Sequence, residues 1–356
     1  MKKRILFILN NLQVGGVQKF VLDIYNNIDK DQFDIFFAVE NIEKIAFFNL
    51  EKDLNKIIFQ LPNHSKICKY RSCLKKLIKK LNINTVHIHM NFLSYLPLSC
   101  CGKRIQKITH AHASYPASSF IAKMARSFIR KYIRKKSDVC LACSVEAGYW
   151  LYGKNNFITL YNGVDEEKYK FRQTNRVEMR ERFSLRDSDK VLLFIGKLSI
   201  IKRCSFLLDV FKEVAKKNRD AKLLIAGDGE LKSDLIEKTI KYNLKERVFL
   251  LGNVNNIPEL LSCSDVLVIP SLYEGFPYAA LEGSANGIPI VIHNKMPFKN
   301  TKFPNLVLSD AENLETFTES VIFSLTVGRY TFSLGDFSLK SVVDKIANIY
   351  KNSENK

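Results

Sequence analysis

Short apolar runs alternate with longer stretches of helical hydrophobic spacing from one end of this chain to the other. Runs such as 266–269 have the length of a buried strand, whereas the segments between such runs repeat apolar residues every three or four positions. This alternation is typical of parallel sheets whose strands are joined by crossover helices. The sequence therefore predicts an α/β protein.

Length and one break in the pattern predict two domains. The 356 residues exceed what one ordinary hydrophobic core holds. An Asn-Gly turn at 162–163 is followed by a polar, charged stretch to about residue 189, after which the alternation restarts. We predict doubly wound domains over residues 1–165 and 166–335, and a closing helix within 336–356. Because ligands bind at the carboxyl ends of parallel strands, functional residues should follow strands and face a cleft between the domains.

The expected elements follow from the same pattern. Strands are predicted in the first half at 4–9, 33–39, 56–60, 85–89, 105–111 and 139–144, with helices beginning near residues 16, 68, 118 and 146. Strands are predicted in the second half at 191–196, 222–226, 248–251, 266–269 and 289–292. Helices are predicted there at 205–217, 231–242, 257–262 and 277–286, with the closing helix at 339–350.

Positive charge is concentrated in the first half of the chain. Residues 1–165 hold 26 Lys and Arg against 11 Asp and Glu, a net charge of +15, whereas the rest has a net charge of +4. Two basic amphipathic helices, at 66–80 and 120–136, carry much of the excess. Such helices can solvate one face of a domain, lie on anionic lipid or bind nucleic acid. Because base-stacking aromatic motifs are missing from the sequence, we expect no nucleic-acid partner.

The sequence favours a cytoplasmic location. It holds no run of about 18 uncharged apolar residues, which is the length that a membrane span needs. The basic N-terminus stops being apolar at Leu9 and no cleavage site follows, so a first strand fits better than a signal peptide. Cys140 and Cys143 have CxxC spacing but no ligand partner, and reduced thiols are expected. Peripheral attachment to the inner face of the cell membrane stays open.

A run of glycine, proline and acidic residues follows the predicted strand at 266–269. Gly275 permits a tight turn and Pro277 suits the first turn of a helix, so backbone amides would point at a ligand such as a diphosphate. Glu282 could accept hydrogen bonds from ribose hydroxyls, and Glu274 would lie near the sugar of a donor. The residues predicted to bind a donor here are Gly275, Phe276, Pro277, Tyr278 and Glu282.

Two lysines and a glycine loop are further candidates. Lys197 and Lys202 follow the predicted strand at 191–196, from which both could reach the cleft and neutralise a leaving diphosphate. Gly16 comes after the first strand and opens a helix, where the backbone can approach an anion closely. For each lysine alone, a solvated surface charge is the simpler interpretation.

Four of the six histidines follow two strands, as His87, His89, His110 and His112. Strand alternation alone places each pair on one face of a sheet, so structural roles are favoured for His87 and His89. His112 stands at a strand end and is the better candidate for the cleft. No carboxylate ligand motif accompanies the four, and no metal site is predicted.

The spacing of Glu274 and Glu282 within YEGFPYAALEG resembles that of the family-four retaining glycosyltransferases, which have the GT-B fold. Further pieces recur in the order of that family over most of residues 5–293. They are GGVQKF, THAHASY, YNGVD, GKLSIIKR, IAGDGEL, LGNVNNIPELLSCSDVLVIPS and ANGIPIV. The chain looks most like the branch that assembles bacterial capsular or exopolysaccharide repeats.

The resemblance implies two Rossmann-like domains facing across a cleft and a metal-free, cofactor-free transfer that retains anomeric configuration. The donor would be a UDP- or GDP-sugar, and the acceptor a glycan or lipid-linked glycan. Residue by residue, it implies that Lys197 and Lys202 bind the diphosphate, Gly275 to Tyr278 supply amides, Glu282 holds the ribose, Glu274 faces the transferred sugar, Gly16 closes on phosphate or acceptor, and His112 lines the acceptor side of the catalytic centre.

The chain departs from the family in two places. Lys197 stands where an arginine is common, which keeps the charge but loses bidentate geometry. After Ile292, the segment HNKMPFKNTKFPNLVLSD replaces the usual glycine-rich segment and glutamate, which predicts an unusual sugar pocket.

Two alternative functions stay open. A GT-B nucleotide-sugar epimerase would use the same donor site without an acceptor. A non-catalytic nucleotide-sugar-binding protein would need neither Glu274 nor His112, so their presence favours an enzyme.

Overall fold

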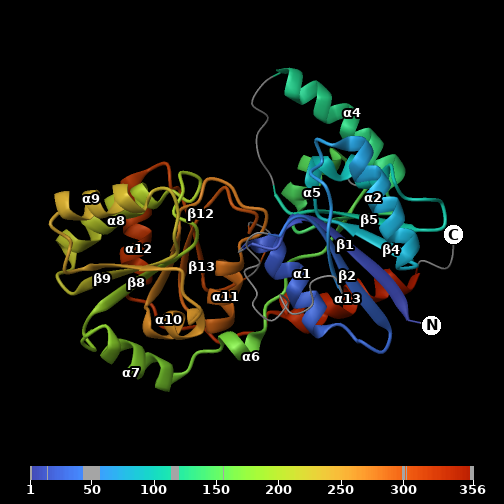
Figure 1. The fold of residues 1–356 in the computed structure, drawn as a ribbon. Helices are drawn as coiled ribbons and strands as arrows, with labels where there is room; N and C mark the ends of the chain where they lie inside the picture. The colour runs from blue at the N-terminus through green and yellow to red at the C-terminus, as the bar shows by residue number, and fades with distance from the viewer. Residues whose placement is uncertain are drawn as a thin grey trace. The chain divides into compact units, whose positions relative to one another are not determined.

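The chain folds into two compact units. The computed structural model describes residues 2–13, 15–42, 57–113, 120–154, 156–298, 301 and 303–352, and of residues 120–123 the backbone alone. The first unit comprises Met1–Gly163 and Leu339–Lys356, and the second comprises Val164–Ser338 (Figure 1). The C-terminal helix therefore belongs to the first unit, so the chain leaves that unit once and returns to it.

The first unit is built on a parallel sheet of seven strands in the order β3-β2-β1-β4-β5-β6-β7. The order runs one way from β1 to β3 and the other way from β4 to β7. The strand order therefore reverses between β1 and β4. These two strands are paired, with Ile5 opposite Thr85. Its strands are β1 Lys3–Asn11, β2 Phe33–Asn41, β3 Ile58–Gln60, β4 Thr85–Ile88, β5 Gln106–Ala111, β6 Val139–Ala142 and β7 Ile158–Thr159.

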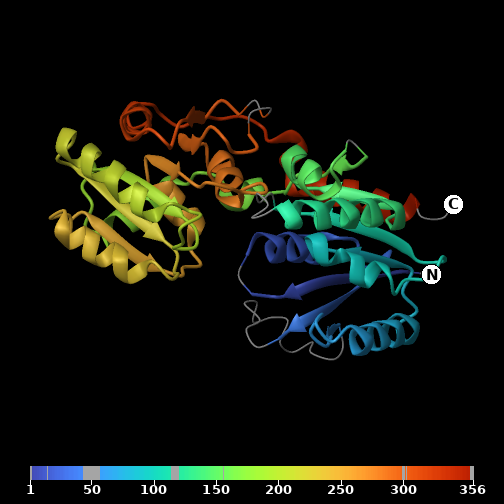
Figure 2. The ribbon, with the colours of Figure 1, turned by 90° about the horizontal axis from the view of Figure 1, so that it is seen from above.

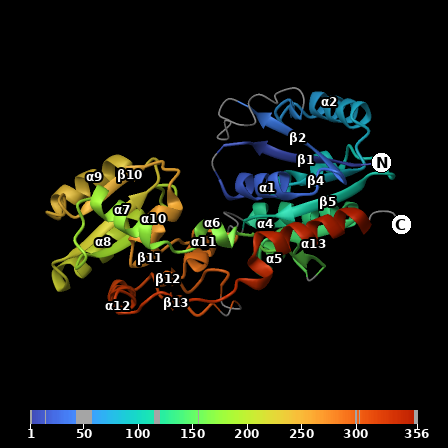
Figure 3. The ribbon, with the colours of Figure 1, turned by 90° about the horizontal axis from the view of Figure 1, so that it is seen from below.

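Helices cover both faces of this sheet. The helices α1 and α13 pack against each other, and α2, α3, α4 and α5 form a second series of neighbours. Figures 2 and 3 show α13 in this unit, and Lys3 Nζ donates to the Tyr350 carbonyl at 2.9 Å. The bounds are α1 Gly16–Asn27, α2 Ile67–Lys80, the 3-10 turn η2 Asn91–Ser94, α3 Tyr95–Leu98, α4 Phe120–Lys136, α5 Val145–Tyr152 and α13 Leu339–Lys351.

The second unit repeats the design with a six-stranded parallel sheet in the order β10-β9-β8-β11-β12-β13. Its reversal lies between β8 and β11, where Val266 pairs with Leu192. All four residues of β11 are buried, as expected for a central strand covered on both faces. The strands are β8 Lys190–Ile195, β9 Ala221–Ala226, β10 Val248–Gly252, β11 Val266–Ile269, β12 Ile290–His293 and β13 Leu306–Ser309.

The helices of the second unit form two layers. Figure 1 shows α8, α9 and α12 on one side of the strands and α7 and α10 on the other. The first layer buries leucine, valine and phenylalanine side chains against the sheet, among them Leu207, Phe211 and Phe317. The bounds are α6 Glu166–Tyr169, α7 Gln173–Arg182, α8 Cys204–Lys217, α9 Lys232–Lys241, α10 Ile257–Cys263, α11 Tyr278–Asn286, α12 Leu314–Ser324 and the 3-10 turn η3 Gly335–Phe337.

The predicted fold class is confirmed, and most of the elements that the sequence did not predict are short or polar. The exception is α12, an 11-residue helix that buries Phe317 and Val321 and for which no helix was predicted. The sequence predicted no strand at β7 or β13, which have two and four residues, and no helix at α7, whose sequence QTNRVEMRER has almost no apolar face. Residues 56 and 118, where a strand and a helix were predicted to begin, lie outside the described residues. None of the described helices is long and apolar enough to cross a membrane. All eight cysteines are free thiols.

Candidate functional site

The loops that follow β8 and β11 meet where the strand order of the second sheet reverses. Such a reversal leaves a crevice at the carboxyl edge of an open parallel sheet, and ligands bind there. The loop after β8 carries Lys197 and Lys202, and the loop after β11 carries Glu274 and Gly275. A backbone hydrogen bond from Leu272 N to the Ile201 carbonyl, 2.8 Å long, joins the two loops. The topology thus brings together residues that lie more than seventy positions apart.

The loop after β8 is also fixed against the loop after β9. Leu198 N donates to the Asp228 carbonyl at 3.0 Å, and Leu231 N donates to the Leu198 carbonyl at 3.1 Å. A Cβ at Gly227 would lie 1.9 Å from the Gly196 carbonyl oxygen, and a Cβ at Gly229 would lie 2.3 Å from that of Leu198. Only glycine allows backbones to approach this closely. The GDG sequence therefore sets the position of the backbone that carries Lys197.

Lys202 and Glu274 form an ion pair between the two loops. Their side chains are 25% and 14% exposed, so both are partly withdrawn from solvent. The pair joins the residue predicted to bind a diphosphate to the residue predicted to face the transferred sugar. The structure thus brings these two predicted residues into direct contact, whereas their separate roles stay predictions.

Lys197 is paired with Glu230, with 3.1 Å between Nζ and Oε2. Both side chains are more than half exposed, at 67% and 54%. The Glu230 backbone amide and Lys197 lower the pKa of the Glu230 carboxyl. Glu230 was not predicted as a site residue, although it belongs to the GDGEL sequence that carries part of the family resemblance.

The helix α11 begins at Tyr278, directly after the loop that holds Glu274. Pro277 is its N-cap residue, with φ −69° and ψ 124°, and no side chain caps this end in the described part of the chain. The first amides of any helix point along its axis without partners inside the helix, so they can receive an anion. Glu282 lies one turn further on and is buried. Gly275, Phe276, Pro277 and Tyr278 therefore lie together at the start of this helix, as predicted.

Aromatic packing supports the loop before α11. Phe276 stacks on Phe298, with ring centroids 4.4 Å apart, and on Phe337, with centroids 5.6 Å apart. Phe298 belongs to the segment that departs from the family pattern after Ile292. That segment therefore packs against the predicted diphosphate loop, a contact that the sequence did not predict.

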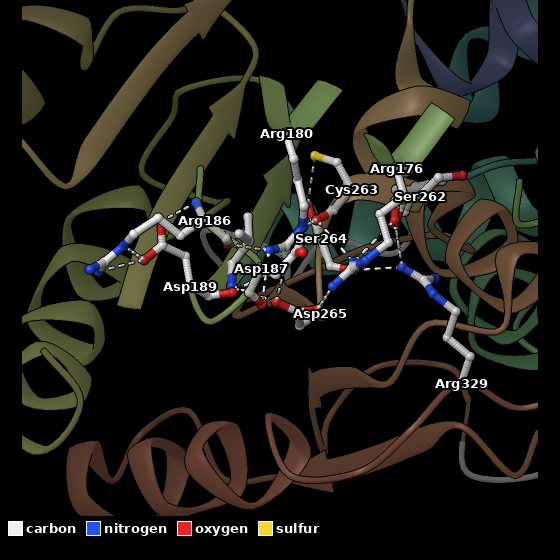
Figure 4. Close-up of polar contacts among 12 residues, drawn as sticks. Arg176, Arg180, Arg186, Asp187, Asp189, Ser262, Cys263, Ser264, Asp265 and Arg329 are labelled. Carbon is white, nitrogen blue, oxygen red and sulfur yellow. Dashed lines mark hydrogen bonds and ion pairs between the residues drawn. The ribbon is translucent and has the colours of Figure 1, made fainter. Parts of the chain in front are cut away.

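An arginine network holds the opposite end of β11 (Figure 4). Arg176 and Arg180, one turn apart on α7, donate to the two carboxylate oxygens of Asp265 at 2.8 and 3.0 Å. Arg329 donates to the carbonyls of Leu261 and Ser262 at 2.9 and 3.0 Å, near the end of α10. Burial lowers the pKa of Arg329 to about 10. These bonds fix the strand from which the Glu274 loop starts, and only the i, i+4 arginine spacing hints at them in the sequence.

In the first unit, Gly16 lies at the start of α1, after the loop that follows β1. Gly15 is the N-cap residue, and no described side chain caps the helix. Gln18 Nε2 donates to Asn11 Oδ1 at 2.9 Å, which closes the loop between strand and helix. The two side chains joined by this bond are neutral amides. Val14, in the same loop, lies outside the described residues.

His112 follows β5 and is hydrogen-bonded to His89, with 2.8 Å between its Nε2 and His89 Nδ1. Its backbone amide donates to Asn91 Oδ1 at 3.4 Å. Burial lowers the pKa of His112 to about 3, so the ring is neutral near pH 7. Because Nε2 is paired with His89, a hydroxyl ligand would meet the other ring nitrogen, Nδ1. The role of His112 in catalysis stays a prediction.

Two family models match adjoining parts of the chain. Residues 14–168 match the model described as Glycosyltransferase Family 4, and residues 175–323 match the model described as Glycosyl transferases group 1. EpsF of Bacillus subtilis (strain 168), named as a glycosyltransferase, is 25% identical over 92% of this chain and 89% of its own length. The UDP-Gal:alpha-D-GlcNAc-diphosphoundecaprenol alpha-1,3-galactosyltransferase of Escherichia coli is 27% identical over 79% of this chain and 76% of its own.

A solved structure shares the fold over almost the whole chain. HepE of Anabaena in complex with UDP and glucose superposes with a TM-score of 0.80 at 15% identity and covers 98% of this chain and 99% of its own. At that identity the likeness concerns the fold alone. It agrees with the two parallel α/β units described above and with the expected GT-B architecture.

Proposed function

We propose that this chain, which belongs to the family-four glycosyltransferases with the GT-B fold, transfers a sugar from a UDP-sugar to a glycan or lipid-linked glycan with retention of anomeric configuration. The observation that carries the proposal is the ion pair between Lys202 and Glu274, which joins the loops after β8 and β11 where the strand order of the second sheet reverses. The biological setting that we propose is synthesis of a bacterial surface polysaccharide. The named activity of the Escherichia coli relative, which acts on a diphosphoundecaprenol-linked sugar, supports that setting.

In the second unit, the donor would be held by its charge. Lys197 and Lys202 would contact the diphosphate, while the backbone of Gly275, Phe276 and Tyr278, at the start of α11, would supply amides. Glu282 would accept hydrogen bonds from the ribose hydroxyls. Ammonium groups and oriented amides stabilise a departing diphosphate directly, so this arrangement calls for no metal at the diphosphate.

Donor binding would replace the carboxylate partners of the two lysines with phosphate groups. Lys202 contacts Glu274 and Lys197 contacts Glu230 in the structure, so a diphosphate that takes both lysines must replace both carboxylates. Exposed ion pairs contribute only about 0.2–1 kcal/mol, so Glu230 is displaced at little cost. Glu274, once released from Lys202, would be available to the sugar hydroxyls. The ion pair thus supports a site in which sugar and diphosphate are engaged together.

The first unit would supply the acceptor side. His112 would line the catalytic centre there, and Gly16 would let the backbone approach the acceptor or a phosphate. The neutral amides near Gly16 and the neutral ring of His112 suit hydroxyl groups, which both donate and accept hydrogen bonds.

The helix α4 would bring the protein to an anionic membrane. Met124 and Phe128 are 51% and 72% exposed, and exposed Lys131 and Lys135 continue the same stripe at spacings of three and four. The other side of the helix is anchored, since Arg130 donates to the Trp150 carbonyl at 3.0 and 2.7 Å. An apolar stripe with adjoining lysines fits the headgroup region of anionic lipid.

The test is a transfer assay with a panel of UDP- and GDP-sugars and an undecaprenyl-diphosphate monosaccharide. We expect one UDP-sugar to give a lengthened lipid-linked glycan, whose new linkage has the anomeric configuration of the donor by NMR. An epimerase would convert the nucleotide sugar without acceptor, and a non-catalytic binding protein would bind it without turnover. Either of these results, or an inverted linkage, would overturn the proposal.

A further inference from the structure

Three buried imidazole rings converge in the first unit, on the sheet face that α1 and α13 cover. His87 lies on β4, His89 follows that strand directly, and His110 lies on β5. All three are buried, and one ring nitrogen from each lies within 4.8 Å of the others. Phe20 of α1 contacts His89 and His110, while Tyr350 of α13 contacts His87.

The spacing of the rings fits ligation of one ion. The ring centroids of His87 and His89 lie 4.1 Å apart, and those of His110 lie 5.4 and 5.6 Å from them. Imidazoles that bind one zinc ion tetrahedrally, with Zn–N distances of about 2.0–2.1 Å, have centroids about 5 Å apart. The three observed separations lie on either side of that value.

The outer nitrogens of two rings are already held. His87 Nδ1 lies 2.8 Å from Tyr350 Oη, and His89 Nδ1 lies 2.8 Å from His112 Nε2. With a proton on each Nδ1, both Nε2 atoms present a lone pair toward the interior of the cluster. Metal-bound histidines are oriented in this way, by a hydrogen bond from the ring nitrogen that does not bind the metal.

The inner nitrogens lack hydrogen bonds. Within the described residues, His87 Nε2, His89 Nε2 and both ring nitrogens of His110 have no partner at hydrogen-bond distance and angle. Buried polar atoms without partners are costly and rare in folded proteins, and a bound ion would satisfy these.

We propose that His87, His89 and His110 bind a divalent transition metal of the zinc type. Imidazole nitrogens suit Zn²⁺, Cu²⁺ and Ni²⁺, whereas Mg²⁺ and Ca²⁺ prefer oxygen ligands. The three ligand nitrogens come from residues that the strand pairing of β4 and β5 already holds together, so the ligands need no rearrangement of the backbone. A water or hydroxide would fill the fourth position, as in other three-histidine zinc sites.

The site would be structural, and one hydrogen bond, from His89 to His112, would join it to the residue proposed to line the catalytic centre. It joins β4 to β5 and, through Tyr350, holds α13 against the same sheet, whereas the residues proposed to bind the donor belong to the second unit. The inference does not depend on the proposed function. It departs from the expectation drawn from the sequence, because only the pairing of β4 with β5 shows that the two histidine pairs share one pocket.

The metal content of the full chain tests the proposal. The untagged protein is produced in zinc-supplemented medium, desalted and measured by elemental analysis. We expect stoichiometric zinc in the unaltered chain, its loss in His87→Asn, and its retention in the control His64→Asn, whose ring pairs with Glu40 outside the cluster. Metal-free unaltered protein, or zinc retained by a folded His87→Asn variant, would overturn the proposal.

A second measurement serves if His87→Asn fails to fold. The unaltered chain is stripped with a chelator and then titrated with Zn²⁺ or Co²⁺. A bound ion should raise the melting temperature by mass action, and Co²⁺ should give a tetrahedral visible spectrum without the charge-transfer band of a thiolate ligand. Equal melting with and without zinc, or a thiolate band, would rule the histidine site out.

Discussion

The reversal points of the two sheets carry different chemistry. In the second unit, lysines and glutamates meet between β8 and β11 as ion pairs. In the first unit, neutral amides follow β1, and the loops after β4 and β5 carry imidazoles that burial keeps neutral. Formal charge is suited to phosphates, whereas neutral donors and acceptors are suited to hydroxyls. The same topology therefore supports two ligand classes, and the proposed division into donor and acceptor units can be tested by substitutions on either side.

The largest effect is expected from Glu274→Gln. The substitution keeps the size of the side chain but removes the charge that faces Lys202, so we expect transfer to fall about 10³-fold through the loss of one oriented charge in the transition state. UDP should bind as tightly as before or several-fold more tightly, because binding no longer breaks an ion pair between Lys202 and the Glu274 carboxylate. Initial rates and calorimetry of UDP binding measure the two quantities. Full activity in this variant would remove Glu274 from the catalytic centre.

Lys202→Ala should lower both the rate of transfer and the affinity for UDP. Without its ammonium group, the leaving diphosphate loses a direct counter-charge, for which we expect about a 10²-fold loss of transfer, and UDP binding should weaken. The control is Lys222→Ala, whose side chain bonds the Glu246 carbonyl and which stands near the start of β9. If Lys202→Ala and Lys222→Ala lowered transfer and UDP binding equally, the charged residues between β8 and β11 would not bind the donor.

The sequence predicted the arrangement of strands well because it depends on apolar runs, but predicted contacts between loops less completely. The sequence could place Lys197, Lys202 and Glu274 after strand ends, whereas their roles stay predictions. It did not predict that Lys197 pairs with Glu230, since this pairing depends on two glycines that let neighbouring loops touch.

Packing of the supporting elements was harder still to predict. The helix α7 is too polar for a periodic apolar pattern, because Arg176 and Arg180 bind Asp265 and backbone carbonyls instead of burying an apolar face. The convergence of three histidines likewise depends on the strand register, which the spacing within each strand does not reveal. Both cases involve polar residues whose partners are distant in the chain.

A moderate effect is expected from His112→Asn in the first unit. Losing one hydrogen bond to an acceptor hydroxyl should lower kcat/KM for the acceptor about tenfold, the equivalent of about 1.4 kcal/mol. The dissociation constant of UDP should stay unchanged, because the donor is assigned to the other unit. Varying acceptor and donor separately in steady-state assays measures the difference. If the substitution weakened UDP binding and left kcat/KM for the acceptor unchanged, the proposed assignment of donor and acceptor to the two units would be wrong.

The smallest effect concerns the membrane, and it compares two exposed phenylalanines. Phe128 on α4 is 72% exposed beside lysines, and Phe323 on α12 of the second unit is 61% exposed. We expect Phe128→Ser to weaken co-sedimentation with anionic vesicles about fivefold, since a partly inserted ring contributes about 1 kcal/mol, and Phe323→Ser to leave it unchanged. Binding should also fall with salt, because the first unit carries most of the positive charge. Equal effects of the two substitutions, or binding indifferent to both lipid charge and salt, would show that α4 is a solvated helix.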